Sequence, residues 1–173
     1  MRQAPNVSTV FVKVEQLHLD ILNPRFSEGD FQNQEEAIVA LCRDEQVLEL
    51  AKDIGKLNSI NPLAMIGAIN DASYAQNSGE HGYVVVDGNR RLCALKLLTN
   101  PSLAPAESQD LFEKISKDWA PIEEVPIVLF SDRKTAEIWL IRTHEGERKG
   151  IGRKDWNAEQ IQRHSGSKKM RLA

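Results

Sequence analysis

The chain has 173 residues with a formal net charge of −3 at pH 7, and 41% of its residues are hydrophobic. This length favours one globular domain with at most a short extension, and the apolar content is sufficient for a hydrophobic core. No apolar run approaches the roughly 18 residues that a transmembrane helix needs, and the sequence does not open with a basic segment followed by an apolar one. The two cysteines, Cys42 and Cys93, form no C-x-x-C motif. We therefore expect a reduced cytoplasmic protein that is neither secreted nor bound to a membrane.

The net charge conceals an asymmetry along the chain. Residues 131–173 contain 11 Lys and Arg against 6 Asp and Glu, whereas residues 1–130 contain 11 against 19. A basic segment next to an acidic body suggests that one face of the protein meets phosphate groups. A charged, solvated helix face explains the same numbers equally well.

The hydrophobic pattern predicts strands and helices in alternation. Strands are expected at residues 10–14, 63–69, 83–86 and 125–130. Helices are expected at residues 34–42, 46–56, 89–98, 111–117, 131–143 and 158–163. In the helix that follows the last strand, Ser131 is expected to act as the N-cap, with Ala136, Trp139 and Leu140 turned inward. Residues 70–82 are polar and predict a long loop.

The most informative segment is residues 83–98, where a strand pattern ends at Asp87-Gly88 and a helical pattern begins at once. Gly88 can adopt a positive φ, and the first-turn amides of the next helix then form an anion site. Arg90 and Arg91 add positive charge at a helix end whose dipole disfavours it, which a bound anion would explain. The alternative is an ordinary turn in which Asp87 or Asn89 caps the helix and both arginines are surface residues.

A second candidate segment covers residues 144–156, where three glycines alternate with basic residues. Successive N–H groups of such a loop can cradle phosphate, and Glu145 could hold a divalent ion bound to the same phosphates. A flexible charged linker is the alternative, although a linker seldom contains a tryptophan such as Trp156. The phosphate-binding candidates in this segment are His144, Lys149, Gly150, Gly152 and Arg153.

The order of these features resembles the ParB/sulfiredoxin superfamily, and specifically the N-terminal domain of ParB-like proteins. The three boxes of that domain are resembled by Asn23-Pro24-Arg25, by residues 88–94 and by residues 143–148. The resemblance implies a ParB-like domain over residues 1–156, with an α+β fold in which helices flank a small mixed β-sheet. Residues 157–173 would form a basic C-terminal helix and tail, which could begin a further segment.

The resemblance also implies a nucleotide site, with CTP or ATP as the ligand and Mg²⁺ as the cofactor. Residues that would grip phosphates or line the same cleft are, by position, Asn23, Arg25, Gly88, Asn89, Arg90 and Arg91. The candidate catalytic residues are Asp87, Glu145 and Arg148, of which Glu145 would hold the metal. Asn89 stands where ParB proteins have a glutamate and sulfiredoxins have their nucleophilic cysteine, so sulfiredoxin chemistry is excluded at this position.

The leading functional hypothesis is a nucleotide-dependent switch in a DNA-associated system. A nucleotide and DNA are its expected partners, a membrane is not, and a homodimer is left open. A metal-dependent nuclease that acts in the same cleft and a non-catalytic DNA-binding module are the alternatives. Whether the nucleotide is hydrolysed does not follow from the sequence, because few carboxylates stand in the boxes.

Overall fold

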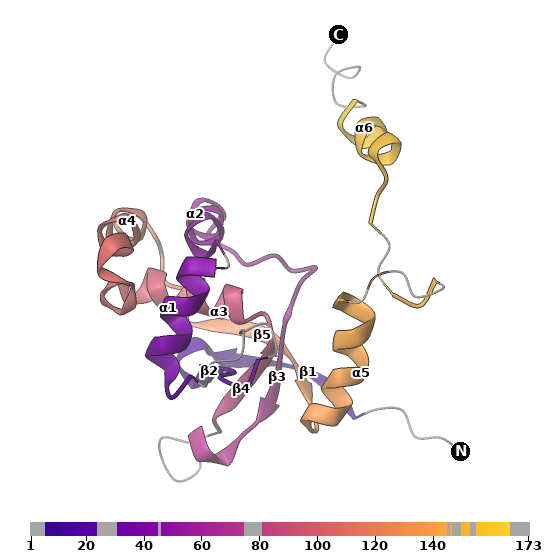
Figure 1. Ribbon diagram of the computed structural model, residues 1–173, viewed down its shortest axis with the longest axis horizontal. Helices are drawn as coiled ribbons and strands as arrows, with labels where there is room; N and C mark the ends of the chain where they lie inside the picture. The colour runs from indigo at the N-terminus through magenta and orange to yellow at the C-terminus, as the bar shows by residue number, and fades with distance from the viewer. Residues whose placement is uncertain are drawn as a thin grey trace. The chain divides into compact units, whose positions relative to one another are not determined.

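Figure 1 shows the computed structural model of the chain, which describes residues 6–23, 31–44, 46–74, 81–144, 146, 150–152 and 155–166. The chain divides into two compact units, residues 1–136 and residues 137–173, and each is described by itself. The described residues form five strands in one mixed sheet and six α-helices. This confirms the expectation of an α and β protein with a small mixed sheet.

The sheet has the strand order β1-β5-β3-β4-β2. Its strands are β1 (Val7–Lys13), β2 (Leu17–Leu19), β3 (Ile66–Asn70), β4 (Tyr83–Asp87) and β5 (Glu124–Phe130). The pairs β1–β5 and β3–β4 are antiparallel, whereas β3–β5 and β2–β4 are parallel. Because β2 and β4 run in the same direction, the residues that follow them, Asp20 and Gly88, come to the same edge of the sheet.

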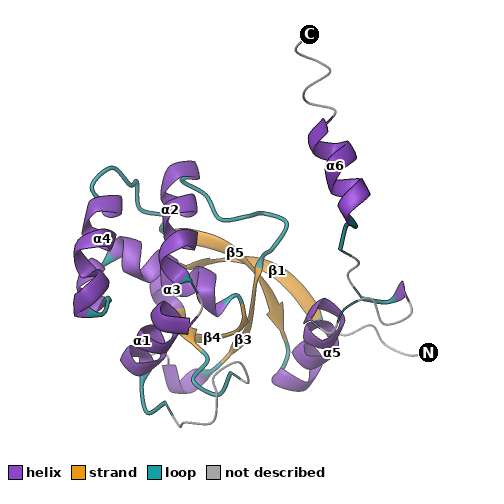
Figure 2. Ribbon diagram, turned by 45° about the horizontal axis from the view of Figure 1, so that its top comes forward, coloured by secondary structure: helices purple, strands orange, loops and turns teal. Residues whose placement is uncertain are grey.

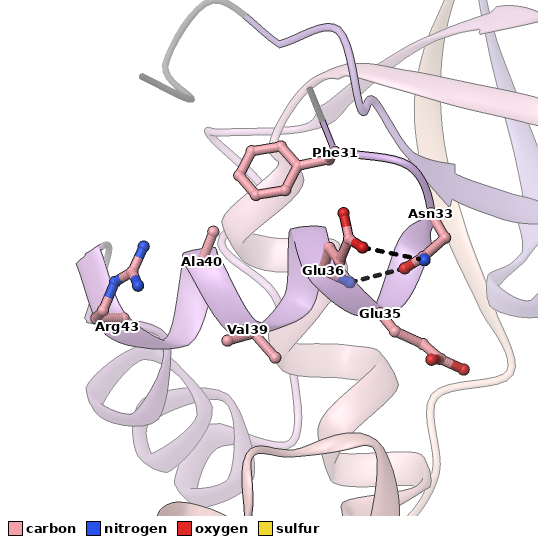
Figure 3. A pocket seen from close by; sticks show the side chains of 7 residues that line it. All are labelled: Phe31, Asn33, Glu35, Glu36, Val39, Ala40 and Arg43. Atoms are coloured by element: carbon pink, nitrogen blue, oxygen red, sulfur yellow. Dashed lines mark hydrogen bonds between the residues drawn. The ribbon is translucent and has the colours of Figure 1, made fainter. Parts of the chain in front are cut away.

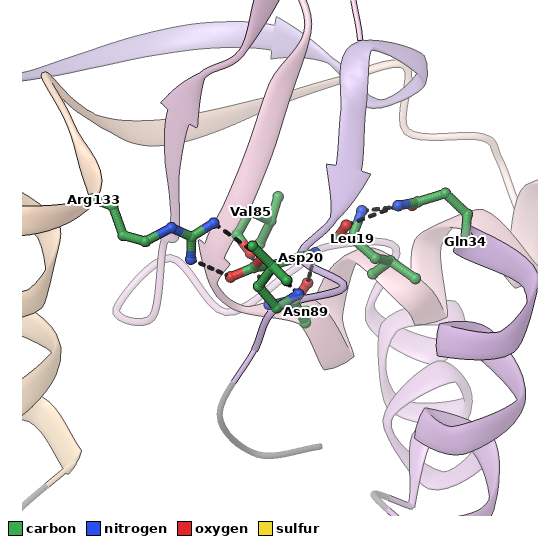
Figure 4. Close-up of polar contacts among 7 residues, drawn as sticks. Leu19, Asp20, Gln34, Val85, Asn89 and Arg133 are labelled. Carbon is green, nitrogen blue, oxygen red and sulfur yellow. Dashed lines mark hydrogen bonds and ion pairs between the residues drawn. The ribbon is translucent and has the colours of Figure 1, made fainter. Parts of the chain in front are cut away.

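Strand β2 lies at the edge of the sheet and was not predicted from the sequence. It has only three residues and pairs with β4 on one side. On its other side the side-chain amide of Gln34 pairs with the backbone of Leu19. The Leu19 N–H donates to Gln34 Oε1 over 2.7 Å, and Gln34 Nε2 donates to the Leu19 carbonyl over 2.8 Å. A side chain thus satisfies backbone groups on the side of β2 where no further strand pairs (Figure 4).

The helices are α1 (Gln34–Asp44), α2 (Val47–Leu57), α3 (Asn89–Thr99), α4 (Ala106–Ser116), α5 (Arg133–His144) and α6 (Ala158–Gly166). Helix α4 starts five residues before the predicted helix at 111–117, directly after Pro105. None of the helices in the described ranges is long and apolar enough to cross a membrane.

Helix α3 is the central helix of the first unit. It packs with α1, α2 and α4 on one side of the sheet (Figure 2), and all four helices contribute to one hydrophobic core. Its sequence is apolar around most of its circumference, as a helix with neighbours on several sides requires. Six of its residues are at most 2% exposed, namely Leu92, Cys93, Ala94, Leu95, Leu97 and Leu98.

Two expectations about helix α5 need correction. The N-cap is Asp132 rather than Ser131, because Asp132 Oδ1 accepts a hydrogen bond from the Thr135 N–H over 2.7 Å. Ala136 is fully buried as expected, but Trp139 is 38% exposed, with the Arg142 guanidinium 5.0 Å from the centre of its ring.

Candidate functional site

The turn before α3 has the backbone conformation that the sequence predicts. Gly88 has φ 95° and ψ 22°, in the left-handed region that favours glycine, and it occupies the N-cap position of α3. Glycine has no side chain, so the N-cap residue itself makes no side-chain capping hydrogen bond to α3. Gly88 therefore does not give the first-turn amides of α3 the side-chain acceptor that a Ser, Thr, Asp or Asn at this position would supply.

The guanidinium of Arg91 folds back over this turn. Its Nη2 donates to the carbonyl of Met65 over 3.2 Å and pairs with Asp87 Oδ2 over 3.3 Å. A Cβ atom added to Gly88 would lie 2.8 Å from the same nitrogen. The Nε of Arg91 is buried and has no hydrogen-bond partner among the described residues. Arg91 thus joins the starts of β3 and α3, and one of its donors remains for an acceptor.

The side chain of Asn89, the first residue of α3, uses both of its polar atoms in hydrogen bonds within the fold. It is 5% exposed. Its Nδ2 donates to the Val85 carbonyl over 2.7 Å, and its Oδ1 accepts from the Asp20 N–H over 2.9 Å (Figure 4). Any contact of Asn89 with a phosphate is therefore left to its backbone amide.

Asp20 is the residue that the sequence reasoning missed. Its side chain is 3% exposed and forms a two-pronged ion pair with Arg133, the first residue of α5, over 2.6 and 3.0 Å (Figure 4). The hydrogen bonds that Arg133 donates to Asp20 raise the pKa of its guanidinium. Asp20 and Arg133 are 113 positions apart in the sequence. The single sequence signal for this site is an aspartate directly after a short apolar run.

The turn that begins at Asp20 brings the first box toward the second. The Asn23 N–H donates to the Asp20 carbonyl over 3.1 Å, and the Asp20 N–H contacts Asn89 at the start of α3. Arg90 is half-buried in the first turn of α3 and has an interaction within the chain. Arg25 lies outside the described residues.

The third group of candidates belongs to the second unit. His144 is the last residue of α5 and is exposed, and Gly150 has a positive φ of 88°. Gly152 is also described. The remaining candidates lie outside the described residues, and they are Glu145, Arg148, Lys149 and Arg153. Because the units are described separately, convergence of this group with Gly88 stays a prediction.

The described carboxylates near α3 do not fit a magnesium site. Asp20 is paired with Arg133 and Asp87 with Arg91, so neither offers the unpaired oxygen ligands that Mg²⁺ prefers. Within the described ranges no three His, Cys, Asp or Glu side chains are grouped to hold a metal ion. We therefore derive no step that uses a metal.

Two pockets of the structure lie away from Gly88. One, of about 520 Å³, follows the outer face of α1 between Phe31 and Arg43 (Figure 3). Its polar pair, Asn33 and Glu36, is a helix cap, since the Glu36 N–H donates to Asn33 Oδ1 over 2.9 Å. The other, of about 480 Å³, lies at the C-terminal end of α3.

No model of a known protein family matches the chain, and a search of curated proteins finds no relative.

Proposed function

We propose that the chain is a ParB-like domain that binds the phosphates of a nucleotide at the N-terminus of α3 and acts as a nucleotide-dependent switch in a DNA-associated system. The observation that supports this proposal is the left-handed Gly88, which occupies the N-cap position of α3 and has no side chain to cap it. A helix start of this kind presents backbone N–H donors and a partial positive charge to an anion.

The arginines of the first turn would add charged donors to these amides. Arg91 is already held by Asp87 and by the Met65 carbonyl, so little conformational entropy is lost when its remaining Nε–H group meets an acceptor. Arg90 supplies a second guanidinium one residue earlier. Guanidinium groups match the geometry of phosphate oxygens, which favours arginine over lysine at such a site.

The contacts of Asp20 supply a route from the ligand to the rest of the molecule. A ligand that shifts the first turn of α3 acts on the Asp20 backbone through Asn89. The Asp20 carboxylate in turn holds Arg133 at the start of α5. These contacts join the two helix starts through one buried residue, and a switch additionally requires that they have two alternative arrangements.

Thermal melting with CTP, ATP, GTP and UTP, each with Mg²⁺ and with EDTA, tests the proposal. We expect one triphosphate to raise the melting temperature, since a ligand at 100 times its Kd stabilises a protein by about 2.7 kcal/mol. The shift should disappear in Arg90→Ala. It should persist in Lys134→Ala, the matched control, because Lys134 is exposed and holds the same second position in α5.

Two outcomes would overturn the switch. One is the absence of a melting shift with every triphosphate at millimolar concentration. The other is a shift with short duplex DNA that Arg90→Ala abolishes and that triphosphates do not alter, because the phosphate site at α3 would then serve DNA directly. Equal losses of the triphosphate shift in Arg90→Ala and Lys134→Ala would place the site elsewhere.

A further inference from the structure

The pocket of about 480 Å³ lies at the opposite end of α3 from Gly88. Its walls come from residues 13–15, from the end of α3 with the turn that follows it, and from residues 121–123. The Val14 N–H donates to the Glu123 carbonyl over 2.8 Å and so joins two of these walls. The volume lies within the range of small-molecule sites.

Lys96 enters this pocket from the last turn of α3. Burial lowers the pKa of its amine, yet its side chain has no ion pair or hydrogen bond within the described part of the chain. Lys13 on the facing wall differs, because it pairs with Glu15 over 3.7 Å. A helix C-terminus favours a cation in general, but a half-buried ammonium group still needs acceptors for its N–H groups.

Two further polar groups face the same space. Glu123 is exposed and forms no ion pair with any described residue, Lys96 included. Asn100 Oδ1 accepts hydrogen bonds from the N–H and the hydroxyl of Ser102, whereas its Nδ2 donates to no described residue. Because Lys13 and Glu15 pair with each other, the polar groups left for a ligand are the Lys96 ammonium group, the Glu123 carboxylate and Nδ2 of Asn100.

The rest of the lining is Thr99, whose hydroxyl donates to the Leu95 carbonyl over 2.9 Å, and apolar residues that include Val14, Leu103 and Ile122. We propose that this pocket binds a small zwitterion with an apolar body, the chemistry of a free α-amino acid such as leucine. The ligand carboxylate meets Lys96 and Asn100, and the ligand ammonium group meets Glu123. A simple carboxylate fits less well, because it would bring a second negative charge near Glu123. This inference is independent of the phosphate site.

Calorimetric titration with three ligands of matched shape tests the proposal. Leucine carries both charges, 4-methylpentanoate only the carboxylate and 3-methylbutylamine only the ammonium group. We expect leucine to bind, and each analogue to bind at least about tenfold more weakly, since a hydrogen bond to a charged group contributes on that scale.

Variants of the two charged residues localise the site. Lys96→Met and Glu123→Gln should each weaken leucine binding by about tenfold. Lys52→Met is the control, because Lys52 pairs with Glu49 on α2 and does not line the pocket. In the unaltered protein, leucine should shift the backbone amide resonances of Leu103 and Ile122 and leave that of Gly88 in place.

The outcomes that overturn the proposal are distinct. Equal binding of leucine and 4-methylpentanoate would show that Glu123 does not bind the ligand ammonium group, and the ligand would then not need to be a zwitterion. Leucine binding unchanged in Lys96→Met would place the ligand elsewhere. If leucine, valine and phenylalanine all leave the Leu103 and Ile122 resonances unmoved at millimolar concentration, the pocket has no such ligand.

Discussion

The first turns of α3 and α5 resemble each other in sequence but differ in how their charges and amides are satisfied. Each begins with basic residues, Arg90 and Arg91 in α3 and Arg133 and Lys134 in α5. In α5 the side chain of Asp132 caps the helix. In α3 the cap position is a glycine without any side-chain acceptor.

The comparison shows which part of the pattern points to a ligand. Arg133 is accounted for by a buried aspartate, and Arg91 by Asp87 and a backbone carbonyl. Two cations at a helix start are therefore not in themselves evidence of a bound anion. The missing side-chain cap at α3 is the feature that distinguishes the two helices, and it remains the basis of the proposed phosphate site.

The largest effect is expected where α5 meets Asp20. Arg133→Met should lower the free energy of unfolding by about 3 kcal/mol, because it leaves a buried carboxylate without its partner. Denaturant unfolding measures this loss, and Asp20→Asn in the same chain should restore part of it. Lys134→Met removes the neighbouring exposed cation and should change stability little. A loss no larger than that of Lys134→Met would mean that Asp20 is satisfied without Arg133.

Loss of the hydrogen bonds that Asn89 of α3 makes with Asp20 and Val85 should lower the free energy of unfolding somewhat less. Asn89→Ala removes two hydrogen bonds and leaves the Asp20 N–H and the Val85 carbonyl without partners, at a cost of roughly 2–3 kcal/mol. Asn89→Asp keeps an acceptor for the Asp20 N–H but places a buried carboxylate against the Val85 carbonyl oxygen, so it should be at least as destabilising as Asn89→Ala. An unfolding midpoint of Asn89→Ala equal to that of the unaltered chain would show that the two hydrogen bonds contribute nothing to stability.

The same two helix starts show what could be predicted from sequence. The strand, the glycine turn and helix α3 follow from local signals, namely a valine run, an Asp-Gly pair and leucines at helical spacing. The short strand β2 carries no such signal, since its place depends on β4 and on the Gln34 side chain. The ion pair of Asp20 with Arg133 joins distant segments and could not be derived from either one.

The cap of α5 illustrates a finer limit. Ser131 and Asp132 are both good capping residues, and the sequence alone does not rank them. The structure selects Asp132, whose carboxylate accepts from the Thr135 N–H, while the Ser131 hydroxyl donates to Asp132 Oδ2. The choice depends on where the helical dihedrals begin, which neighbouring contacts decide.

A third prediction tests the conformation that makes α3 different. Gly88→Ala should destabilise the protein by about 1–2 kcal/mol, because a Cβ is disfavoured in the left-handed region. The added carbon would also meet the Arg91 guanidinium. The double variant Gly88→Ala/Arg91→Ala lacks the guanidinium. Its loss of stability relative to Arg91→Ala, measured by denaturant unfolding, should therefore contain only the cost of the left-handed backbone conformation. Equal stability of the Gly88→Ala variant and the unaltered chain would show that the turn can take another conformation.

The smallest effect is expected from pH, at His18 in the strand that leads to Asp20. Burial lowers the pKa of His18, with Lys96 acting in the same direction and Asp71 opposing both. Its Nε2 is buried without a partner among the described residues, and its ring stacks on Tyr74 with centres 4.5 Å apart.

The folded state holds His18 neutral more strongly than the unfolded chain does. As the pH falls below the ordinary histidine pKa of about 6.5, the unfolded chain therefore binds more protons than the folded state. Stability should therefore be complete above that pH and should decline as the pH falls from it toward the lower folded-state pKa. His18→Gln should flatten this decline in a series of melting curves. Asp132 affects stability at lower pH than His18 does. The hydrogen bond from the backbone N–H of Thr135 lowers the pKa of the Asp132 carboxyl group. Its contribution to stability is therefore complete above the ordinary pKa of an aspartate and is lost as the pH falls through the lower folded-state pKa. Histidines titrate between about pH 7 and 5. If the loss of stability over this range is unchanged in His18→Gln, another group causes it and the Asp20 region is insensitive to pH.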